Sequence, residues 1–163
     1  MLRWPPPCWR AVRDLLRRYW RCGPGTSDAF AGASVPAELA TVEFLTDLDR
    51  VLRRGGIVAM NLTDAAPFAW ARRCLAAFAA CFAEVAVSAE VPVWKGRRFG
   101  NLVTVAGEEV PVEALRRRLT RASFPYRLLT GGELAGWVGG AAPFTESDAE
   151  PSPSPAWSRG WFS

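Results

Sequence analysis

Apolar residues recur at helical spacing from about residue 42 to residue 53. Thr41 carries a hydroxyl that can cap this helix, and Glu43 places an acid in the first turn, where the helix dipole favours it. Gly55-Gly56 then ends the segment. The predicted buried stripe of the helix consists of Phe44, Leu48, Val51 and Leu52.

A second stretch with helical spacing runs from about residue 67 to residue 83. Pro67 suits a first helical turn, because the amide hydrogen that proline lacks has no partner there. The apolar side chains predicted to be buried are Trp70, Cys74, Phe78 and Phe82. A third, shorter helix is predicted from Val112 to Arg121, with Leu115 and Leu119 on its inner side.

Three segments have the pattern of strands. Residues 57–62 form a short, nearly continuous apolar run, which is typical of a strand covered on both faces. Residues 85–94 and 101–106 flank the turn-forming sequence at residues 95–100. This arrangement predicts an antiparallel hairpin.

The order of these elements predicts an α/β fold whose last strand pairs antiparallel with its neighbour. It supplies about half of a doubly wound, Rossmann-like sheet, which is normally built from two βαβαβ halves. We expect three regions along the chain. Residues 1–27 form a basic, poorly ordered leader, residues 28–142 a partial Rossmann-like domain, and residues 143–163 a flexible tail rich in Pro and Ser.

Composition adds two restrictions. The 163 residues include no His, which excludes every mechanism that needs an imidazole. The net charge of +4 comes from the leader, where six Arg face one acid, Asp14, so that the remainder of the chain is close to neutral. A basic nucleic-acid footprint spread over the fold is therefore not expected.

The leader admits two interpretations. Residues 9–21 have the pattern of a basic amphipathic helix, which would contact a membrane surface or nucleic acid with Trp4, Trp9 and Trp20 as anchors. The alternative, which we favour, is a poorly ordered extension. No apolar run reaches the length of about 18 residues that a membrane span needs.

The cysteines point to packing and not to metal chemistry. Cys74 and Cys81 stand seven residues apart on one predicted helix face, so that they lie roughly 10 Å apart, too far for a disulfide. We expect both to be core thiols in a reducing cytosol. No metal site is expected, because the chain has neither His nor a C-x-x-C pair.

Two acidic segments fall where an open α/β sheet binds its ligands, beyond the carboxyl ends of the strands. Ser27 to Gly32 leads into the first helix, and Asn61 to Asp64 closes the apolar strand. Asp28 and Asp64 would then face one crevice, where a carboxylate can accept a proton from an attacking amine or hold a cation. The alternative, favoured by spacing alone, is that both are turn-forming or capping residues.

Several segments taken in order resemble the spermidine synthase-like proteins, relatives of the polyamine aminopropyltransferases with the class I methyltransferase-like fold. The similarity covers roughly residues 27 to 107. The segments that carry it begin at Asp28 (Asp-Ala-Phe-Ala-Gly), Val35 (Val-Pro-Ala-Glu-Leu), Thr41 (Thr-Val-Glu-Phe), Leu52 (Leu-Arg-Arg-Gly-Gly), Ala59 (Ala-Met-Asn-Leu) and Arg97 (Arg-Arg-Phe-Gly-Asn-Leu-Val). No single motif is specific, but the order and spacing together are.

The resemblance implies aminopropyl transfer from decarboxylated S-adenosylmethionine to a putrescine-like amine. Asp28 matches the family's general base, whereas Ala31 stands where characterised members have a second acid that holds the acceptor. Asn61 and Asp64 remain the expected substrate-binding residues. Gly23-Pro24-Gly25 follows no predicted strand and is a poor substitute for the family's Gly-rich donor loop. We therefore expect a truncated, impaired relative with no bound cofactor, for which decarboxylated S-adenosylmethionine (or S-adenosylmethionine) is the family's co-substrate.

The competing hypothesis is a non-catalytic interaction module. Its basic leader would contact an anionic surface, or an exposed sheet edge would pair with another subunit. The partners considered are thus a small amine, a second copy of the chain or a missing N-terminal half, and, less favoured, nucleic acid or a membrane at residues 1–27.

Overall fold

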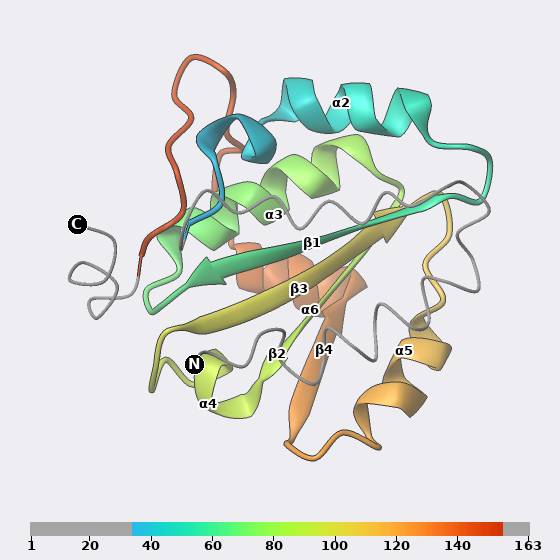
Figure 1. The fold of residues 1–163 in the computed structure, drawn as a ribbon, viewed down its shortest axis with the longest axis vertical. Coiled ribbons are helices and arrows are strands. Elements are labelled where there is room, and N and C mark those ends of the chain that lie inside the picture. The colour runs from blue at the N-terminus through green and yellow to red at the C-terminus, as the bar shows by residue number, and fades with distance from the viewer. Residues whose placement is uncertain (1–33, 155–163) are drawn as a thin grey trace, which may run out of the picture.

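The computed structural model describes residues 34–154 (Figure 1). The predicted leader at residues 1–27, the candidate base Asp28 and the Gly23-Pro24-Gly25 segment lie outside the described residues, as do residues 155–163.

The described residues form one four-stranded antiparallel sheet with helices around it. The strands are β1 (Ile57–Asp64), β2 (Glu84–Glu90), β3 (Gly100–Gly107) and β4 (Tyr126–Thr130). Their order in the sheet is β1-β3-β2-β4, and all neighbouring pairs are antiparallel. The chain thus places β3 between the two strands that precede it (Figure 1).

The predicted hairpin is confirmed, with one correction. β2 and β3 pair antiparallel, with Val85 opposite Ala106. β2 ends at Glu90, however, and residues predicted to continue the strand form a short helix instead, α4 (Val91–Trp94). Pro92 lies in the first turn of α4, where proline is tolerated, whereas inside a central strand it would remove a ladder hydrogen bond.

The three predicted helices are all present. They are α2 (Val42–Val51), α3 (Ala69–Cys81) and α5 (Val112–Leu119). Thr41 caps α2 as expected, because its Oγ1 accepts a hydrogen bond of 3.2 Å from the Phe44 amide. The sequence did not predict η1 (Ala37–Ala40), β4 or α6 (Gly131–Val138).

Most of the core lies on one face of the sheet, which we call the α3 face because α3 packs across it. Its strand residues include Val58, Leu62, Val87, Leu102 and Leu129. Trp70, Cys74 and Phe78 of α3 are buried against them, as predicted. Helix α6 shares this face (Figure 1).

Helix α2 buries a different set of side chains from the one predicted. Leu45, absent from the predicted stripe, is fully buried, whereas Val51 is 67% exposed. Phe44, Leu48 and Leu52 are half-buried against the same core. The reason is that α2 packs mainly on α3 and η1, so the buried side of the helix is set by those neighbours.

The opposite face, which we call the α5 face, has a smaller apolar core. Leu115 and Leu119 of α5 are buried there, as predicted. The strand residues that they join are Ile57, Ala86, Val103, Val105 and Leu128. Among residues 34–154, α5 is the one helix whose buried residues belong to this cluster.

The C-terminal segment corrects one prediction. Residues 143–154, expected to begin a flexible tail, pack against the domain, and Phe144 is fully buried. Phe144 also pairs with Thr41 in a parallel bridge, and Trp70 Nε1 donates a hydrogen bond of 2.8 Å to the Glu150 carbonyl. A single aromatic anchor and a few hydrogen bonds thus hold a segment whose composition is that of a linker.

Two further features are the state of the cysteines and the absence of a membrane-spanning helix among the described residues. Cys74 and Cys81 are free thiols, of which Cys74 is buried and Cys81 half-buried. Burial raises the pKa of the Cys74 thiol well above its usual value. No helix in the described part of the chain has the length and apolar character needed to cross a membrane.

Candidate functional site at the carboxyl end of β1

Asp64, a predicted substrate-binding residue, ends β1 and is only 4% exposed. Its Oδ1 accepts a hydrogen bond of 2.7 Å from the Ala65 amide, and its Oδ2 accepts one of 2.9 Å from the Ala71 amide in the first turn of α3. Both carboxylate oxygens therefore cap the turn and the helix that follow the strand. This geometry corresponds to the capping alternative considered for Asp64.

Burial raises the pKa of Asp64 above its ordinary value, while the two amide hydrogen bonds act in the opposite direction. Desolvation is the larger effect, because water is excluded from the charged carboxylate. A buried carboxyl of this kind is a stronger proton acceptor than an exposed one. Its two oxygens are nevertheless already engaged with the backbone.

Asn61, the other predicted substrate-binding residue, points toward the opposite face of the sheet. Alternation along β1 places Asn61 with Ile57 on the α5 face, and Asp64 with Leu62 on the α3 face. The structure therefore brings both residues to the same end of β1 but not into one pocket. Asn61 is 5% exposed, and its Nδ2 donates a hydrogen bond of 3.2 Å to Asn101 Oδ1.

The amide oxygen of Asn61 is a buried acceptor without a hydrogen-bond partner within residues 34–154. Such a group costs free energy unless a donor reaches it. An ammonium or amine group, which carries only donors when charged, matches this acceptor. Asn61 thus has an acceptor left for a ligand; Thr104 Oγ1 and Arg72 Nε are the other buried side-chain atoms without a hydrogen-bond partner in the described part of the chain.

A second set of polar side chains fastens the C-terminal segment to the same end of β1. The Val35 amide donates a hydrogen bond of 2.8 Å to Ser152 Oγ, and the Ser152 amide donates one of 3.0 Å to the Val35 carbonyl. Ser152 Oγ also lies 3.0 Å from Thr63 Oγ1. Because Ser152 Oγ accepts from Val35, its hydroxyl hydrogen can be donated to Thr63. These bonds join three separate segments of the chain.

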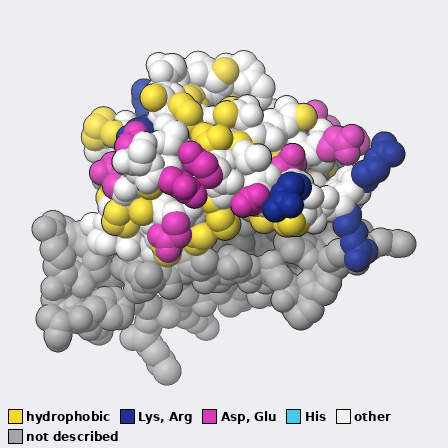
Figure 2. All heavy atoms as spheres, turned by 90° about the horizontal axis from the view of Figure 1, so that it is seen from above, with side chains coloured by type: hydrophobic (Ala, Val, Ile, Leu, Met, Phe, Trp, Pro, Cys, Tyr) yellow, Lys and Arg dark blue, Asp and Glu magenta, His cyan; other side chains and the backbone are white. Residues whose placement is uncertain are grey.

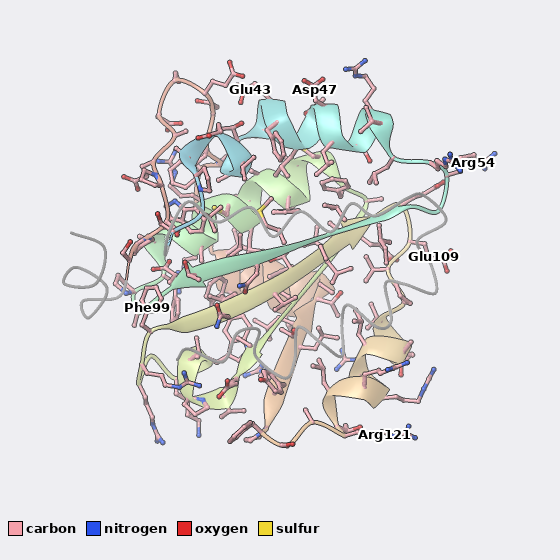
Figure 3. The ribbon with its side chains drawn as sticks, in the orientation of Figure 1. Glu43, Asp47, Arg54, Phe99, Glu109 and Arg121 are labelled. Carbon is pink, nitrogen blue, oxygen red and sulfur yellow. The ribbon has the colours of Figure 1, made fainter. Side chains whose placement is uncertain are left out.

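The turn at residues 95–100, beside this end of the sheet, carries three basic residues, Lys95, Arg97 and Arg98. Figure 3 shows Phe99 near the end of the sheet where β1 finishes and β3 begins. Arg98 forms an ion pair with Glu90 of β2, while Lys95 and Arg97 are exposed. Arg98 is therefore engaged within the fold, which agrees with a solvated turn.

Glu113 and Arg116 of α5, three residues apart, form an ion pair on the helix surface at 3.8 Å. Among the described residues no group of three or more acidic or sulfur side chains is placed to hold a metal ion.

The sequence analysis did not single out Thr63, Asn101 or Ser152. Asn101 offered a weak signal, since it opens the strand predicted to follow the basic turn, and Ser152 offered none.

Comparison with known proteins agrees with this architecture. No family model and no curated protein matches the chain. Among solved structures, the chain is similar to a probable spermidine synthase from Corynebacterium glutamicum, with 29% sequence identity and a TM-score of 0.65. The match covers 73% of this chain and 45% of that protein, so this chain spans less than half of its neighbour's length.

The fold defines a mixed α/β protein whose four-stranded antiparallel sheet corresponds to part of a methyltransferase-like fold. Within that class, the likeness supports a spermidine synthase-like relationship for the chain. The resemblance inferred from the sequence is thereby confirmed.

Proposed function

We propose that this protein is a transferase of the spermidine synthase-like group, acting on a small amine at the carboxyl end of β1. The observation that carries the proposal is the buried Oδ1 of Asn61 in the C-terminal half of β1, which has no hydrogen-bond partner among residues 34–154. The structural likeness to a probable spermidine synthase supports the same reaction class.

The proposed reaction transfers an aminopropyl group from decarboxylated S-adenosylmethionine to the amine. The amine nitrogen forms a bond to the transferred carbon, the carbon–sulfur bond breaks with its electrons going to sulfur, and the nitrogen loses a proton. Asp28 would accept that proton, in the role its sequence position implies. Asn61 would hold an amine hydrogen, and Asp64 would keep the β1–α3 turn in place through its two amide bonds.

We further propose that the chain is impaired when it acts alone. A nucleoside donor needs closely approaching backbone amides, usually from a Gly-rich turn at a helix N-terminus. Residues 34–154 place no such turn at the carboxyl end of β1, where Phe68 precedes α3 and Asp64 accepts from the Ala71 amide in its first turn. Binding of the donor is thus the step expected to fail.

The test combines donor binding with turnover. We expect isothermal titration of the chain with decarboxylated S-adenosylmethionine to show no micromolar complex, and we expect no conversion of putrescine. The C. glutamicum protein serves as the comparison sample under the same conditions. A micromolar donor complex would overturn the impairment, and turnover that is unaffected by both Asp28→Asn and Asn61→Leu would overturn the assigned roles.

A further inference from the structure

Four arginines lie together at the C-terminal end of α5. Although the chain beyond the leader is close to neutral, Arg116, Arg117 and Arg118 fill the last turn of this helix. Arg121 follows in a turn that is closed by a hydrogen bond of 3.2 Å from its amide to the Arg118 carbonyl. We call these four residues the α5 arginine cluster. Three of them are exposed, and Arg118 is half-buried.

Most of the positive charge in this cluster has no counter-ion within residues 34–154. Arg116 pairs with Glu113 at 3.8 Å. Arg117, Arg118 and Arg121 make no side-chain hydrogen bond or ion pair in the described part of the chain. The helix dipole favours cations in a last turn, but Arg117 and Arg121 are four residues apart, where like charges repel each other. The cluster therefore has charge left for an anionic partner.

The acidic residues of this region lie toward the other end of α5. Glu113 is in the first turn of the helix, and Glu108 and Glu109 precede it. Figure 3 shows Glu109 well separated from Arg121. The positive charge is thus concentrated at one end of the helix, where its field attracts anions.

An exposed aromatic ring lies close to the cluster. Phe124 is 53% exposed, and it and Val51 are the large hydrophobic residues that the described part of the chain exposes. Phe124 is three positions from Arg121, so their Cα atoms lie at most about 11 Å apart. The backbone beside the ring is anchored, because the Pro125 carbonyl accepts a hydrogen bond of 3.0 Å from the Val91 amide. The surface thus combines unpaired guanidinium groups with a fixed aromatic residue.

We propose that the α5 arginine cluster and Phe124 bind single-stranded nucleic acid. A guanidinium group can donate two parallel hydrogen bonds to one phosphate. An exposed ring such as that of Phe124 stacks on a base, which is accessible for stacking in a single strand and not in a duplex. The site is a local patch on one element, and it is independent of the proposed transferase site at the end of β1.

Two other anionic occupants fit this surface less well. An anionic membrane takes up the apolar side of an amphipathic helix, and that side of α5, with Leu115 and Leu119, is buried in the fold. A second copy of this chain would have to offer an acidic surface, but the acids of α2 are balanced by Arg50, Arg53 and Arg54. Neither occupant accounts for an exposed aromatic ring beside the arginines.

The test is binding of the full 163-residue chain to fluorescein-labelled oligo(dT) of about 20 nucleotides, followed by fluorescence anisotropy at several salt concentrations. Arg117→Gln/Arg121→Gln removes two charges and keeps good helix formers. We expect it to weaken binding at least about tenfold at low salt. The slope of log K against log salt should fall by about 1.4, because each phosphate contact to a single strand contributes about 0.7. The basic leader is the same in every sample.

Arg53→Gln/Arg54→Gln is the matched control, because it removes the same charge from exposed positions after α2. Figure 3 places Arg54 far from Arg121. This variant should bind oligo(dT) like the unaltered chain. Phe124→Ala should weaken oligo(dT) binding about fivefold or more, as expected for the loss of stacking on one base, and should leave binding of inorganic polyphosphate unchanged.

Equal losses for the two arginine pairs would overturn the proposal, because binding would then follow total charge. Unchanged affinity of the Arg117→Gln/Arg121→Gln chain would overturn it as well, as would a loss in Phe124→Ala that polyphosphate shares. Retention on phosphatidylserine vesicles without oligo(dT) binding would identify a membrane as the occupant instead. Salt-sensitive self-association without oligo(dT) binding would identify a second copy, and either result would contradict the proposal.

Discussion

The two faces of the sheet differ in how their cores are built. On the α3 face, side chains from α2, α3 and α6 join one large apolar cluster with the strands. On the α5 face, a smaller cluster gathers around α5, and polar residues such as Asn61 and Ser88 are buried farther along the strands. Because the α3 face has the larger apolar cluster, we expect it to contribute more to stability than the α5 face.

The surface around α2 differs from both. Figure 2 shows acidic and apolar side chains side by side on the face of the molecule seen from the α2 side. Glu43 and Asp47 point outward from α2, while Arg54 lies beyond its end (Figure 3). This pattern is that of a solvated helix with one buried side, and α2 contributes to the core mainly through Leu45.

The largest expected effect sharpens the contrast between the faces. Phe78→Ala removes a fully buried ring of the α3 face that stacks on Phe82. We expect it to lower the free energy of unfolding by about 3–5 kcal/mol. Urea unfolding followed by circular dichroism measures this. Val51→Ala, at an exposed position on α2, is the control and should change stability by less than about 0.5 kcal/mol.

A smaller loss is expected on the α5 face. Leu115→Ala removes a buried side chain from the smaller cluster and should cost about 2–3 kcal/mol, the lower part of the range for such changes. Phe124→Ala, at a 53% exposed position, is its control. If Leu115→Ala proved as costly as Phe78→Ala in the same unfolding assay, the two faces would contribute equally and the comparison would fail.

The hydrogen bonds of Ser152 to Val35 and Thr63 at the end of β1 can be tested by substituting two serines. Ser152→Ala removes the hydroxyl that accepts from the Val35 amide and contacts Thr63, leaving a buried amide without its acceptor. We expect a loss of about 1–3 kcal/mol. Ser154→Ala, two residues on and exposed, should be neutral. Equal midpoints for the two variants in thermal unfolding would show that the C-terminal segment contributes no stability through this contact.

The capping role of Asp64 predicts a moderate effect. Asp64→Ala leaves the amides of Ala65 and Ala71 without their acceptor and should cost about 1–2 kcal/mol. Asp49→Ala, at an exposed position on α2, is the matched control. Full stability of the Asp64→Ala variant would be incompatible with a cap and would leave ligand binding as the reason for an acid at this position.

The smallest effects concern the pH dependence of two carboxylates with opposite shifts. The pKa of Asp64 is raised by burial, so its contribution to stability is complete below the ordinary pKa of 3.8 and is lost as the pH rises through the folded value. The pKa of Asp148 is lowered to about 2 by the Thr145 amide and by Arg73, so its contribution is present above 3.8 and is lost as the pH falls toward 2.

Carbon-detected NMR titration of the side-chain carboxyls measures both directions in one sample. Asp64 should titrate above 3.8 and Asp148 near 2. Because Asp148 is exposed, Asp148→Asn should change overall stability only slightly. If Asp64 titrated below 3.8, its two amide hydrogen bonds, and not burial, would dominate its pKa.

Local sequence rules predicted the elements that depend on local signals. The helices near residues 42–51, 69–81 and 112–119 follow from apolar spacing, the Thr41 cap and the terminating glycines. α6 was not predicted because Gly131, Gly132 and Gly136 give it a low helix propensity, which packing against α3, β2 and β4 overrides. The buried side of α2 likewise depends on α3, which local spacing does not reveal.

The amino-acid sequence by itself determined the α/β class, the residues that end β1 and the likeness to spermidine synthase-like proteins. Only the tertiary structure decided that Asn61 and Asp64 face opposite sides of the sheet, that Ser152 fastens Val35 to Thr63, and that β1 and β4 are the outermost of the described strands. The physical reason is the separation along the sequence over which each kind of interaction acts. Capping and periodicity act within a few residues, whereas strand order and hydrogen bonds between distant segments depend on which surfaces the whole chain buries together.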